Sequence, residues 1–189
     1  GLPEELYAEL RRRGVSRRIA PVVEGYARVP GASGAALHIL GIDPFAEAPF
    51  RNYTPETASG SDVARLLTQP GAVMVLEETA RRLALSPGGA LPLRVGVEPG
   101  KVILSGFLRP PDEVTRQALE STAVADISTA QELLGMEGRL SRIDLSVPEG
   151  EAGEGALSRI RGMLPAGAEI VPTAARGKAM ERMTRAFSM

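Results

Sequence analysis

The sequence predicts a mixed α+β fold, with a discontinuous α/β subdomain from both chain ends and a smaller inserted strand-rich α/β subdomain. Short apolar runs bounded by turn residues alternate with amphipathic helical segments along the 189 residues. A helix-then-strand unit stands at each end of the chain, and the middle is rich in strands and turns. These observations place one subdomain at residues 1–43 and 138–189 and the insertion at residues 44–137.

The first element is a helix over residues 2–13. Leu2, Leu6 and Leu10 recur on one helical face, and Pro3 suits the first turn because the missing amide proton has no helical partner there.

Two strands and a loop follow. The apolar, β-branched segments 19–29 and 35–42 predict a hairpin across the turn sequence PGASG. Residues 43–69 are rich in Pro, Ala, Ser and Thr and predict a loop with one short helix near residues 63–67.

Residues 73–76 are continuously apolar and predict a buried strand that leads into a charged helix. Glu77 and Glu78 stand four residues before Arg81 and Arg82, which predicts two ion pairs on the exposed helical face and suits the helix dipole. The expected inner stripe consists of Ala80, Leu83 and Ala84. The sequence SPGG then ends the helix, and the next strand covers residues 91–95.

The centre of the chain predicts two more strands and a capped helix. Residues 101–108 form a strand paired with the preceding one across the sequence VEPG, and residues 124–127 form a short buried strand. Ser128 is the expected N-cap of the next helix, with Gln131 three residues on completing a capping box.

The last part of the chain predicts a strand–helix–strand unit and a final helix. Residues 140–147 alternate in polarity, residues 155–164 form the helix, residues 168–172 form the return strand and residues 174–189 form the final helix. We expect the strand at residues 19–29 to pair with this unit.

Composition excludes several functions. The 22 basic and 23 acidic residues give a net charge of −1, which lacks the basic excess that nucleic-acid binding needs. The absence of cysteine rules out disulfides, thiolate metal sites and thiol catalysis. The sequence contains neither a signal peptide nor an apolar run long enough to span a membrane. Because it begins at Gly1 and ends within a predicted helix, we interpret it as a fragment of a larger protein.

No residue pattern predicts a catalytic, cofactor or metal site. His38 is the only histidine and has no accompanying nucleophile or carboxylate pair, so a structural or surface role is favoured over a catalytic base. Asp43, Glu47 and Asp62 fall in the loop region and are expected to be solvated. The arginines at residues 11–13 and 17–18 favour a solvated helix end over a contact with lipid headgroups or an acidic partner.

The final predicted helix carries one apolar face that includes Met180, Met183 and Phe187. We predict that this face is an interface, packed on the domain or on a neighbouring copy of the protein, and a role at a membrane surface is the second alternative.

Taken in order, several segments resemble one family. They are LPEELYAELRRRGVSRRIAPVVEGYARV, LHILGIDP, VMVLEETARRLALSPGGALPLRV, VILSGFL, ADISTAQELLGMEGRLSRIDLSV and AMERMTRAFSM. Their order and spacing resemble the extracytoplasmic domain (the periplasmic core domain) of FtsX-like and MacB-like ABC transporter permeases. The resemblance covers nearly the whole chain except about residues 44–70.

The resemblance implies a porter-like, membrane-proximal subdomain from the chain ends and a membrane-distal inserted subdomain. It implies a non-catalytic domain without cofactors, on the outer side of the bacterial inner membrane, that couples ATP-driven motion of membrane helices to a substrate or partner. The implied partners are a second permease subunit, a cytoplasmic ATP-binding subunit and a periplasmic protein. If membrane spans flank the chain, its first and last helices should lie side by side at one pole.

Two other classes of function stay open from the sequence. A free periplasmic module could bind a small molecule or peptide in a groove between the subdomains. A hydrolase is less favoured, because no nucleophile–base pair is visible.

Overall fold

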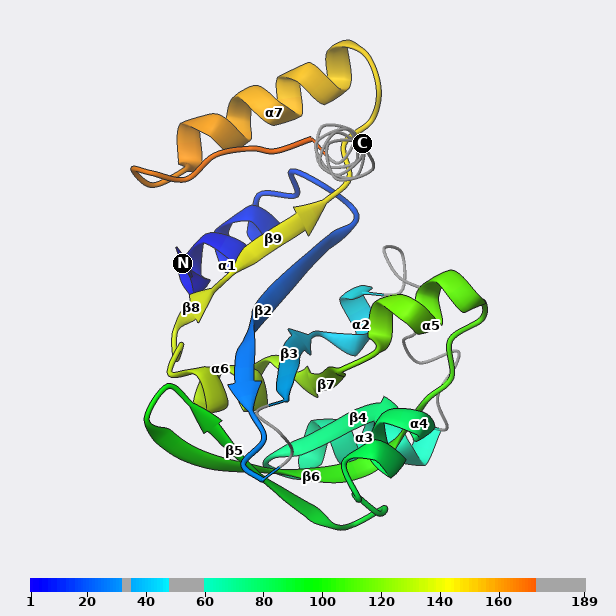
Figure 1. The fold of residues 1–189 in the computed structure, drawn as a ribbon. Helices are drawn as coiled ribbons and strands as arrows, with labels where there is room; N and C mark the ends of the chain where they lie inside the picture. The colour runs from blue at the N-terminus through cyan, green and yellow to red at the C-terminus, as the bar shows by residue number, and fades with distance from the viewer. Residues whose placement is uncertain (32–34, 48–59, 173–189) are drawn as a thin grey trace, which may run out of the picture. The chain divides into compact units, whose positions relative to one another are not determined.

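The structure is a computed structural model that describes residues 1–31, 35–47 and 60–172. Two compact units divide the chain, Gly1–Ser146 and Val147–Met189. The strands of the described chain all belong to the first unit, together with helices α1 to α6, and the second unit contains α7 (Figure 1).

Nine strands are assigned in the described residues: β1 (Leu2–Pro3), β2 (Ile19–Arg28), β3 (Ala36–Ile42), β4 (Ala72–Leu76), β5 (Ala90–Val95), β6 (Glu98–Leu108), β7 (Thr122–Asp126), β8 (Arg139–Leu140) and β9 (Arg142–Leu145). The helices of the described residues are α1 (Glu4–Arg12), α2 (Pro44–Glu47), α3 (Gly60–Thr68), α4 (Glu77–Arg82), α5 (Glu113–Leu119), α6 (Ile127–Leu134) and α7 (Glu151–Met163). The mixed α+β class predicted from the sequence is confirmed.

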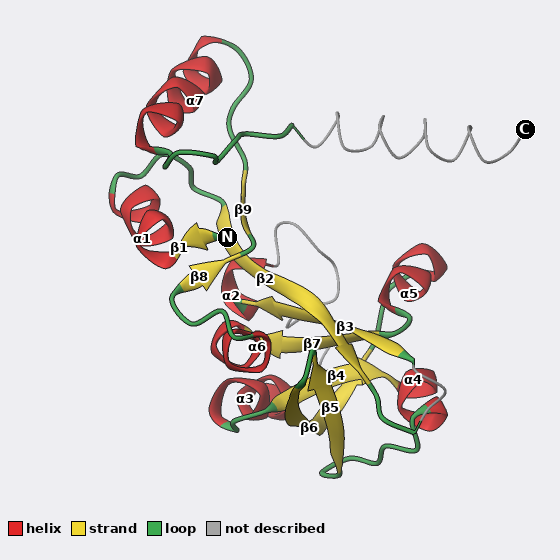
Figure 2. Ribbon diagram, turned by 60° about the vertical axis from the view of Figure 1, so that its left-hand side comes forward, coloured by secondary structure: helices red, strands yellow, loops and turns green. Residues whose placement is uncertain are grey.

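The main sheet closes on itself. Its strand order is β3-β7-β4-β6-β5-β2-β9, and β2 also pairs with β3, so six strands form a ring and β9 lies outside it (Figure 2). The seam between β5 and β2 is a single residue pair, Arg28 opposite Arg94. The predicted pairing of the segment at residues 19–29 with the C-terminal strand is confirmed, because β2 pairs with β9 in antiparallel fashion.

The core consists of aliphatic side chains on both sides of this sheet. All five residues of β4 are buried, as its continuous apolar sequence predicts, because the strand lies between β6 and β7. Helix α3 contacts β4, β6 and β7, and α6 contacts β2, β3 and β7. At the closest approach of α6, a Cβ atom placed on Gly41 would lie 2.4 Å from the Ala130 Cβ.

Helix α4 differs in part from its prediction. The expected pair of Glu77 with Arg81 forms at 3.5 Å, whereas the Glu78 carboxylate instead accepts from Arg116 of α5. The helix ends at Arg82, so Ala84 is exposed and has a positive φ of 52°. Of the expected inner stripe, Ala80 is buried, and Leu85 takes the place predicted for residue 84.

Two local predictions are wrong, one of a hairpin turn and one of a helix N-cap. The β5–β6 hairpin turns at Gly96 and Val97, one residue earlier than expected, and the glycine at φ 60° matches the II′ turn that suits hairpin twist. Ser128 does not cap α6, because the helix begins at Ile127 after Asp126. Gln131 donates to the Arg139 carbonyl at 3.0 Å, so no capping box forms.

The predicted C-terminal strand–helix–strand unit is right in its first strand and its helix and wrong in its return strand. Residues 168–172 form no strand, although α7 covers the predicted helix and begins four residues before it, at Glu151. The predicted final helix lies outside the described residues, so the expected side-by-side chain ends stay a prediction. The division of the chain into two subdomains at residues 44 and 137 also stays a prediction. Strands from both predicted subdomains pair in one sheet.

Candidate interaction surface

The outer face of β2, β3 and β9 carries a continuous row of polar and aromatic side chains. Because side chains alternate along a strand, Val23 and Ala27 enter the core while Glu24, Tyr26 and Arg28 lie on the other face. Tyr26 is 69% exposed, which is unusual for a large side chain in the middle of a ten-residue strand.

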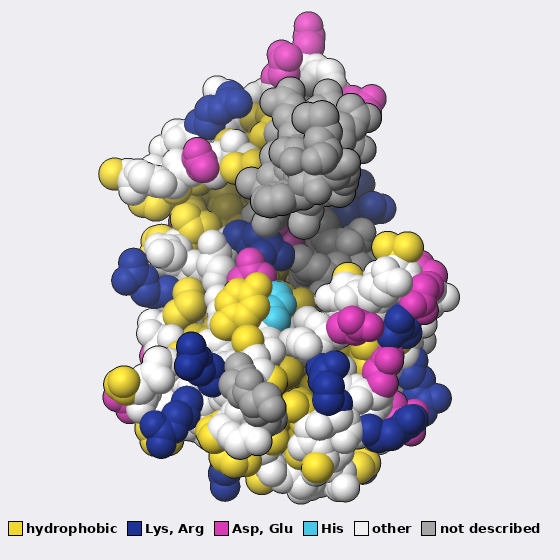
Figure 3. All heavy atoms as spheres, in the orientation of Figure 1, with side chains coloured by type: hydrophobic (Ala, Val, Ile, Leu, Met, Phe, Trp, Pro, Cys, Tyr) yellow, Lys and Arg dark blue, Asp and Glu magenta, His cyan; other side chains and the backbone are white. Residues whose placement is uncertain are grey.

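His38 lies on β3 directly opposite Tyr26, and their ring centroids are 5.0 Å apart. The Nε2 atom of His38 is 3.1 Å from the Glu24 Oε2 atom. Figure 3 shows the histidine, in cyan, at the surface of the molecule. The contacts of His38 among the described residues are thus a ring contact with Tyr26, a strand pairing and a carboxylate.

The row continues onto β9 through ion pairs. The Arg142 guanidinium donates to Glu24, and its Nε atom donates to the Asp144 Oδ1 atom at 3.1 Å. Ser141 supports the same corner, because its hydroxyl accepts from the Glu24 backbone N–H at 2.8 Å. Glu24 is thereby held between His38 and Arg142, and the row becomes a preorganised polar surface.

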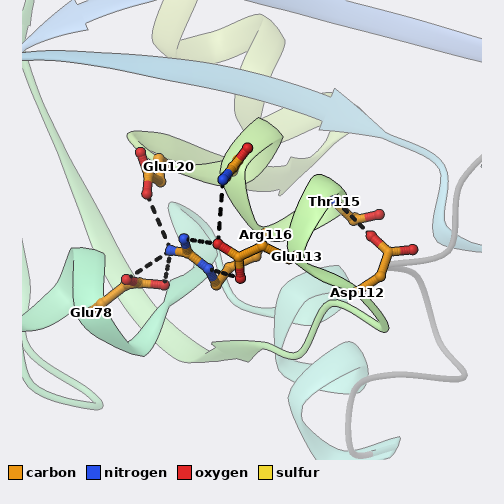
Figure 4. A network of polar contacts seen from close by, with 7 residues as sticks. Glu78, Asp112, Glu113, Thr115, Arg116 and Glu120 are labelled. Carbon is orange, nitrogen blue, oxygen red and sulfur yellow. Dashed lines mark hydrogen bonds and ion pairs between the residues drawn. The ribbon is translucent and has the colours of Figure 1, made fainter.

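A second polar cluster joins α4 to α5 around Arg116 (Figure 4). Its Nη1 atom donates to both oxygens of Glu78 at 2.9 and 3.0 Å and to Glu120 at 3.1 Å. Its Nε atom donates to Glu113 at 2.7 Å. These hydrogen bonds lower the pKa of the Glu113 carboxyl and raise the pKa of the Arg116 guanidinium. Three carboxylates around one guanidinium leave the cluster with a net negative charge.

Asp112 begins α5 in the way that N-cap residues do. Its Oδ1 atom accepts from the Thr115 backbone N–H at 2.7 Å, and this hydrogen bond lowers the pKa of the Asp112 carboxyl.

The arginine cluster of residues 11–13 lies at the end of α1, and part of it is neutralised there. Arg12 and Arg13 both pair with Glu9, and the Arg11 guanidinium lies 5.7 Å from the centre of the Tyr7 ring. Burial raises the pKa of Tyr7. This arrangement agrees with the solvated helix end that the sequence predicts.

Two of the remaining candidate residues make local contacts. Asp43 caps α2, since its Oδ1 atom accepts from the Phe45 N–H at 3.0 Å, and Asp62 lies 3.9 Å from Arg65. Within residues 1–31, 35–47 and 60–172, no group of three or more acidic or histidine side chains could hold a metal ion. Met180, Met183 and Phe187 lie outside the described residues.

Sequence reasoning missed the exposed aromatic at Tyr26 and the link from Glu78 to Arg116. Tyr26 stands two residues from both Glu24 and Arg28, so strand alternation places all three side chains on one face. This alternation could have indicated that Tyr26 is exposed. No local signal marks the Arg116 link, since it joins residues 38 apart.

The fold is that of extracytoplasmic domains from ABC transporter permeases. It is similar to the crystal structure of the extracellular domain of the noncanonic ABC-type transporter YknZ from Gram-positive bacteria, with a TM-score of 0.56 and 13% identity over 82% of this chain and 78% of that one. It is also similar to the periplasmic region of MacB from Actinobacillus actinomycetemcomitans, with a TM-score of 0.53 and 11% identity over 86% of this chain and 72% of that one.

The sequence comparison points to the same class. Over its whole length the chain is 38% identical to an uncharacterized ABC transporter permease protein, Rv0987, of Mycobacterium tuberculosis, and it spans 22% of that protein. No protein-family profile matches. The resemblance to FtsX-like and MacB-like permease domains is therefore confirmed, and a free binding module is not favoured. In the part of the chain that the structure describes, no helix is both long and apolar enough to cross a membrane.

Proposed function

We propose that the chain is a non-catalytic extracytoplasmic domain of an ABC transporter permease, which couples ATP-driven motion of membrane helices to a substrate or partner outside the membrane. The observation that carries the proposal is the similarity of all 189 residues to one segment of a permease, together with the fold. The domain lies on the outer side of the inner membrane in this proposal.

The polar side chains of the outer face pair with one another, and this pairing supports a non-catalytic role. Glu24, Arg142 and Asp144 belong to an ion-pair row, and His38 joins that row at Glu24. A general base must lie within hydrogen-bond reach of the group that it deprotonates, and among the described residues no serine or threonine hydroxyl is recorded against the His38 ring. The hydrogen-bond partner recorded for the His38 ring is a carboxylate that already pairs with an arginine.

The proposed transporter contains a second permease subunit and a cytoplasmic ATP-binding subunit, and the domain meets a periplasmic partner protein. The chain-end segments 1–43 and 138–189 form the membrane-proximal part in this proposal, and residues 44–137 form the distal part. The apolar helical face expected at Met180, Met183 and Phe187 would serve as an interface with the domain body or the second permease subunit.

Complementation of a permease deletion strain tests the proposal. A full-length permease in which residues 1–189 are replaced by a flexible linker should assemble with its ATP-binding subunit and hydrolyse ATP, yet fail to restore the lost phenotype. The matched variant His38→Gln should restore it fully. Complementation by the linker variant would contradict the coupling role. Failure of His38→Gln at normal expression would contradict the non-catalytic role.

A further inference from the structure

The two arginines at the seam between β2 and β5 lie directly opposite each other. Arg28 and Arg94 form the single residue pair that joins these strands, where the ring of strands closes. Directly opposite residues of an antiparallel pair share one face of the sheet, with Cβ atoms about 4.5–5.5 Å apart. Both arginines are exposed, whereas their neighbours Ala27 and Leu93 enter the core. Two guanidinium groups therefore extend from adjacent points on the outer face.

Among the described residues, no carboxylate forms a salt bridge with Arg28 or Arg94. Glu98 lies on the other face from Arg94, because its partner in the β5–β6 register is the next residue of β5. Glu24 shares the face of Arg28 but stands four residues away, about 14 Å along the strand, and it already pairs with Arg142. The charge of the arginine pair is thus left uncompensated by its neighbours in the sheet.

The flanking strands add a third cation to this part of the face. The residues opposite the pair on β3 and β6 are Ala36 and Pro99, and neither is charged. Lys101 stands two residues beyond Pro99 on the same face of β6, so it is a diagonal neighbour of Arg94. Diagonal neighbours lie about 7–8 Å apart, which long side chains can span. Because the whole chain has a net charge of −1, this positive cluster is a local feature.

The arginine pair has a cost to the folded domain that a bound anion would remove. Like charges directly opposite in a sheet are destabilising, and here they occupy the single residue pair of the β2–β5 seam. A ligand that binds both guanidinium groups replaces this repulsion by attraction. Because it binds only where the two strands meet, it stabilises the folded state increasingly as its concentration rises.

The charge and the number of acceptor atoms favour a phosphate group over a carboxylate. A phosphate monoester carries about 1.5 to 2 negative charges at pH 7 and three strong acceptor oxygens. It can therefore balance two arginines and accept hydrogen bonds from both. A carboxylate carries a single charge, and one arginine in the bidentate geometry already uses both of its oxygens. The planar fork of arginine also matches phosphate better than the ammonium group of lysine does.

We propose that Arg28 and Arg94, with Lys101 beside them, form a binding site for a phosphate group, which is either free phosphate or the monoester of a lipid headgroup. The two guanidinium groups donate hydrogen bonds to one phosphate from two sides, and Lys101 contributes a further positive charge. The inference goes beyond the proposed function, because it assigns a ligand to the domain and does not depend on the coupling of ATP-driven motion.

The first test is thermal unfolding of the purified 189-residue chain in sodium phosphate, chloride and acetate at equal ionic strength. Phosphate should raise the melting temperature of the wild type more than chloride or acetate does, and the double variant R28Q/R94Q should lose this difference. The control R17Q/R109Q removes two other exposed arginines and should keep the difference. A general effect of phosphate on protein surfaces would be equal in all three proteins. Without phosphate, R28Q/R94Q should melt above the wild type, because the repulsion across the seam is gone.

Isothermal titration calorimetry with inorganic phosphate measures the affinity itself. R28Q/R94Q should bind phosphate about tenfold more weakly than the wild type or worse, and R17Q/R109Q should stay within about twofold. The variant R28K/R94K keeps both charges but lacks the planar forks, so it should bind about threefold more weakly or worse. The lysine variant also decides the question if the glutamine variant does not fold.

Phosphatidylcholine vesicles with and without phosphatidic acid distinguish the two sources of the phosphate group. Sedimentation of the chain with phosphatidic acid vesicles that is lost in R28Q/R94Q would assign the site to a lipid headgroup. Arginine-dependent binding of inorganic phosphate without vesicle binding would assign it to a soluble phosphate. Either result supports the proposal.

Three results would overturn the proposal. The first is an absence of arginine-dependent binding to both inorganic phosphate and phosphatidic acid vesicles. The second is an equal loss of affinity in R28Q/R94Q and R17Q/R109Q. The third is stabilisation by acetate as large as that by phosphate, which would assign the pair to a carboxylate-bearing partner instead. These measurements use the chain alone, so their failure leaves the complementation result standing.

Discussion

Asp112 shows how one side chain sets a local boundary and makes it depend on pH. Its pKa is lowered from 3.8 by the hydrogen bond from the Thr115 N–H, so the folded state favours the charged carboxylate. A lowered folded pKa stabilises the protein above the unfolded value, and this contribution is lost as pH falls through the folded pKa.

The Asp112→Ala variant should therefore lower the free energy of unfolding at pH 7, and its difference from the wild type should shrink as the pH falls below about 4. Asp112→Asn is the control, because its amide oxygen can still accept from Thr115 but carries no charge. Urea unfolding across this pH range provides the measurement. A difference for Asp112→Ala of the same size at every pH would show that the charge has no part in the cap.

At the scale of elements, α6 is fixed to the sheet by small residues that allow close approach. Gly41 of β3 faces Ala130 of α6, and Gly25 of β2 faces the Leu134 side chain, where an added Cβ would lie 2.9 Å from a methyl carbon. Larger residues at these positions would separate helix and sheet.

Gly41→Ala should lower the free energy of unfolding by about 1–3 kcal/mol, because the new methyl group overlaps the Ala130 Cβ in a buried contact. A double-mutant cycle with Ala130→Gly isolates this overlap from the helix propensity of glycine. The cost of Gly41→Ala should be smaller when Ala130→Gly is also present. Additive effects would mean that α6 does not contact the sheet as described.

The predictable elements were those with a continuous local pattern. The buried strand β4 and the hairpin of β2 and β3 follow from apolar runs bounded by turn residues, whereas the start of α6 does not. A serine followed three residues later by glutamine matches a capping box, but Asp126 takes the N-cap position and accepts from the Ser128 hydroxyl. Neighbouring polar residues compete for that position, and only the tertiary fold decides between them.

At the scale of the whole molecule, the sequence predicted the pairing of β2 with β9 but did not reveal how the sheet closes through β5. Residues 168–172 contain Ile170 and Val171 and look like a strand, yet no partner pairs with them in the described chain. The arginine pair of Arg28 and Arg94 likewise appears only when the sheet closes.

The resemblance to permease domains came from another kind of information. No short motif identifies the chain, but the order of its segments resembles permease domains. The fold and a relative that matches all 189 residues of this chain confirm that resemblance. Order along the chain holds this information because surface side chains change more readily than the succession of strands and helices.

The side of the membrane on which the domain lies tests the central claim most directly. The chain has no cysteine, and Val97 at the tip of the β5–β6 hairpin is 83% exposed, so Val97→Cys introduces one reactive thiol into this domain of the full permease. A membrane-impermeant maleimide should label it in right-side-out membrane vesicles without detergent, with the unsubstituted permease as control. Labelling that appears only in inverted or detergent-treated vesicles would contradict an extracytoplasmic domain.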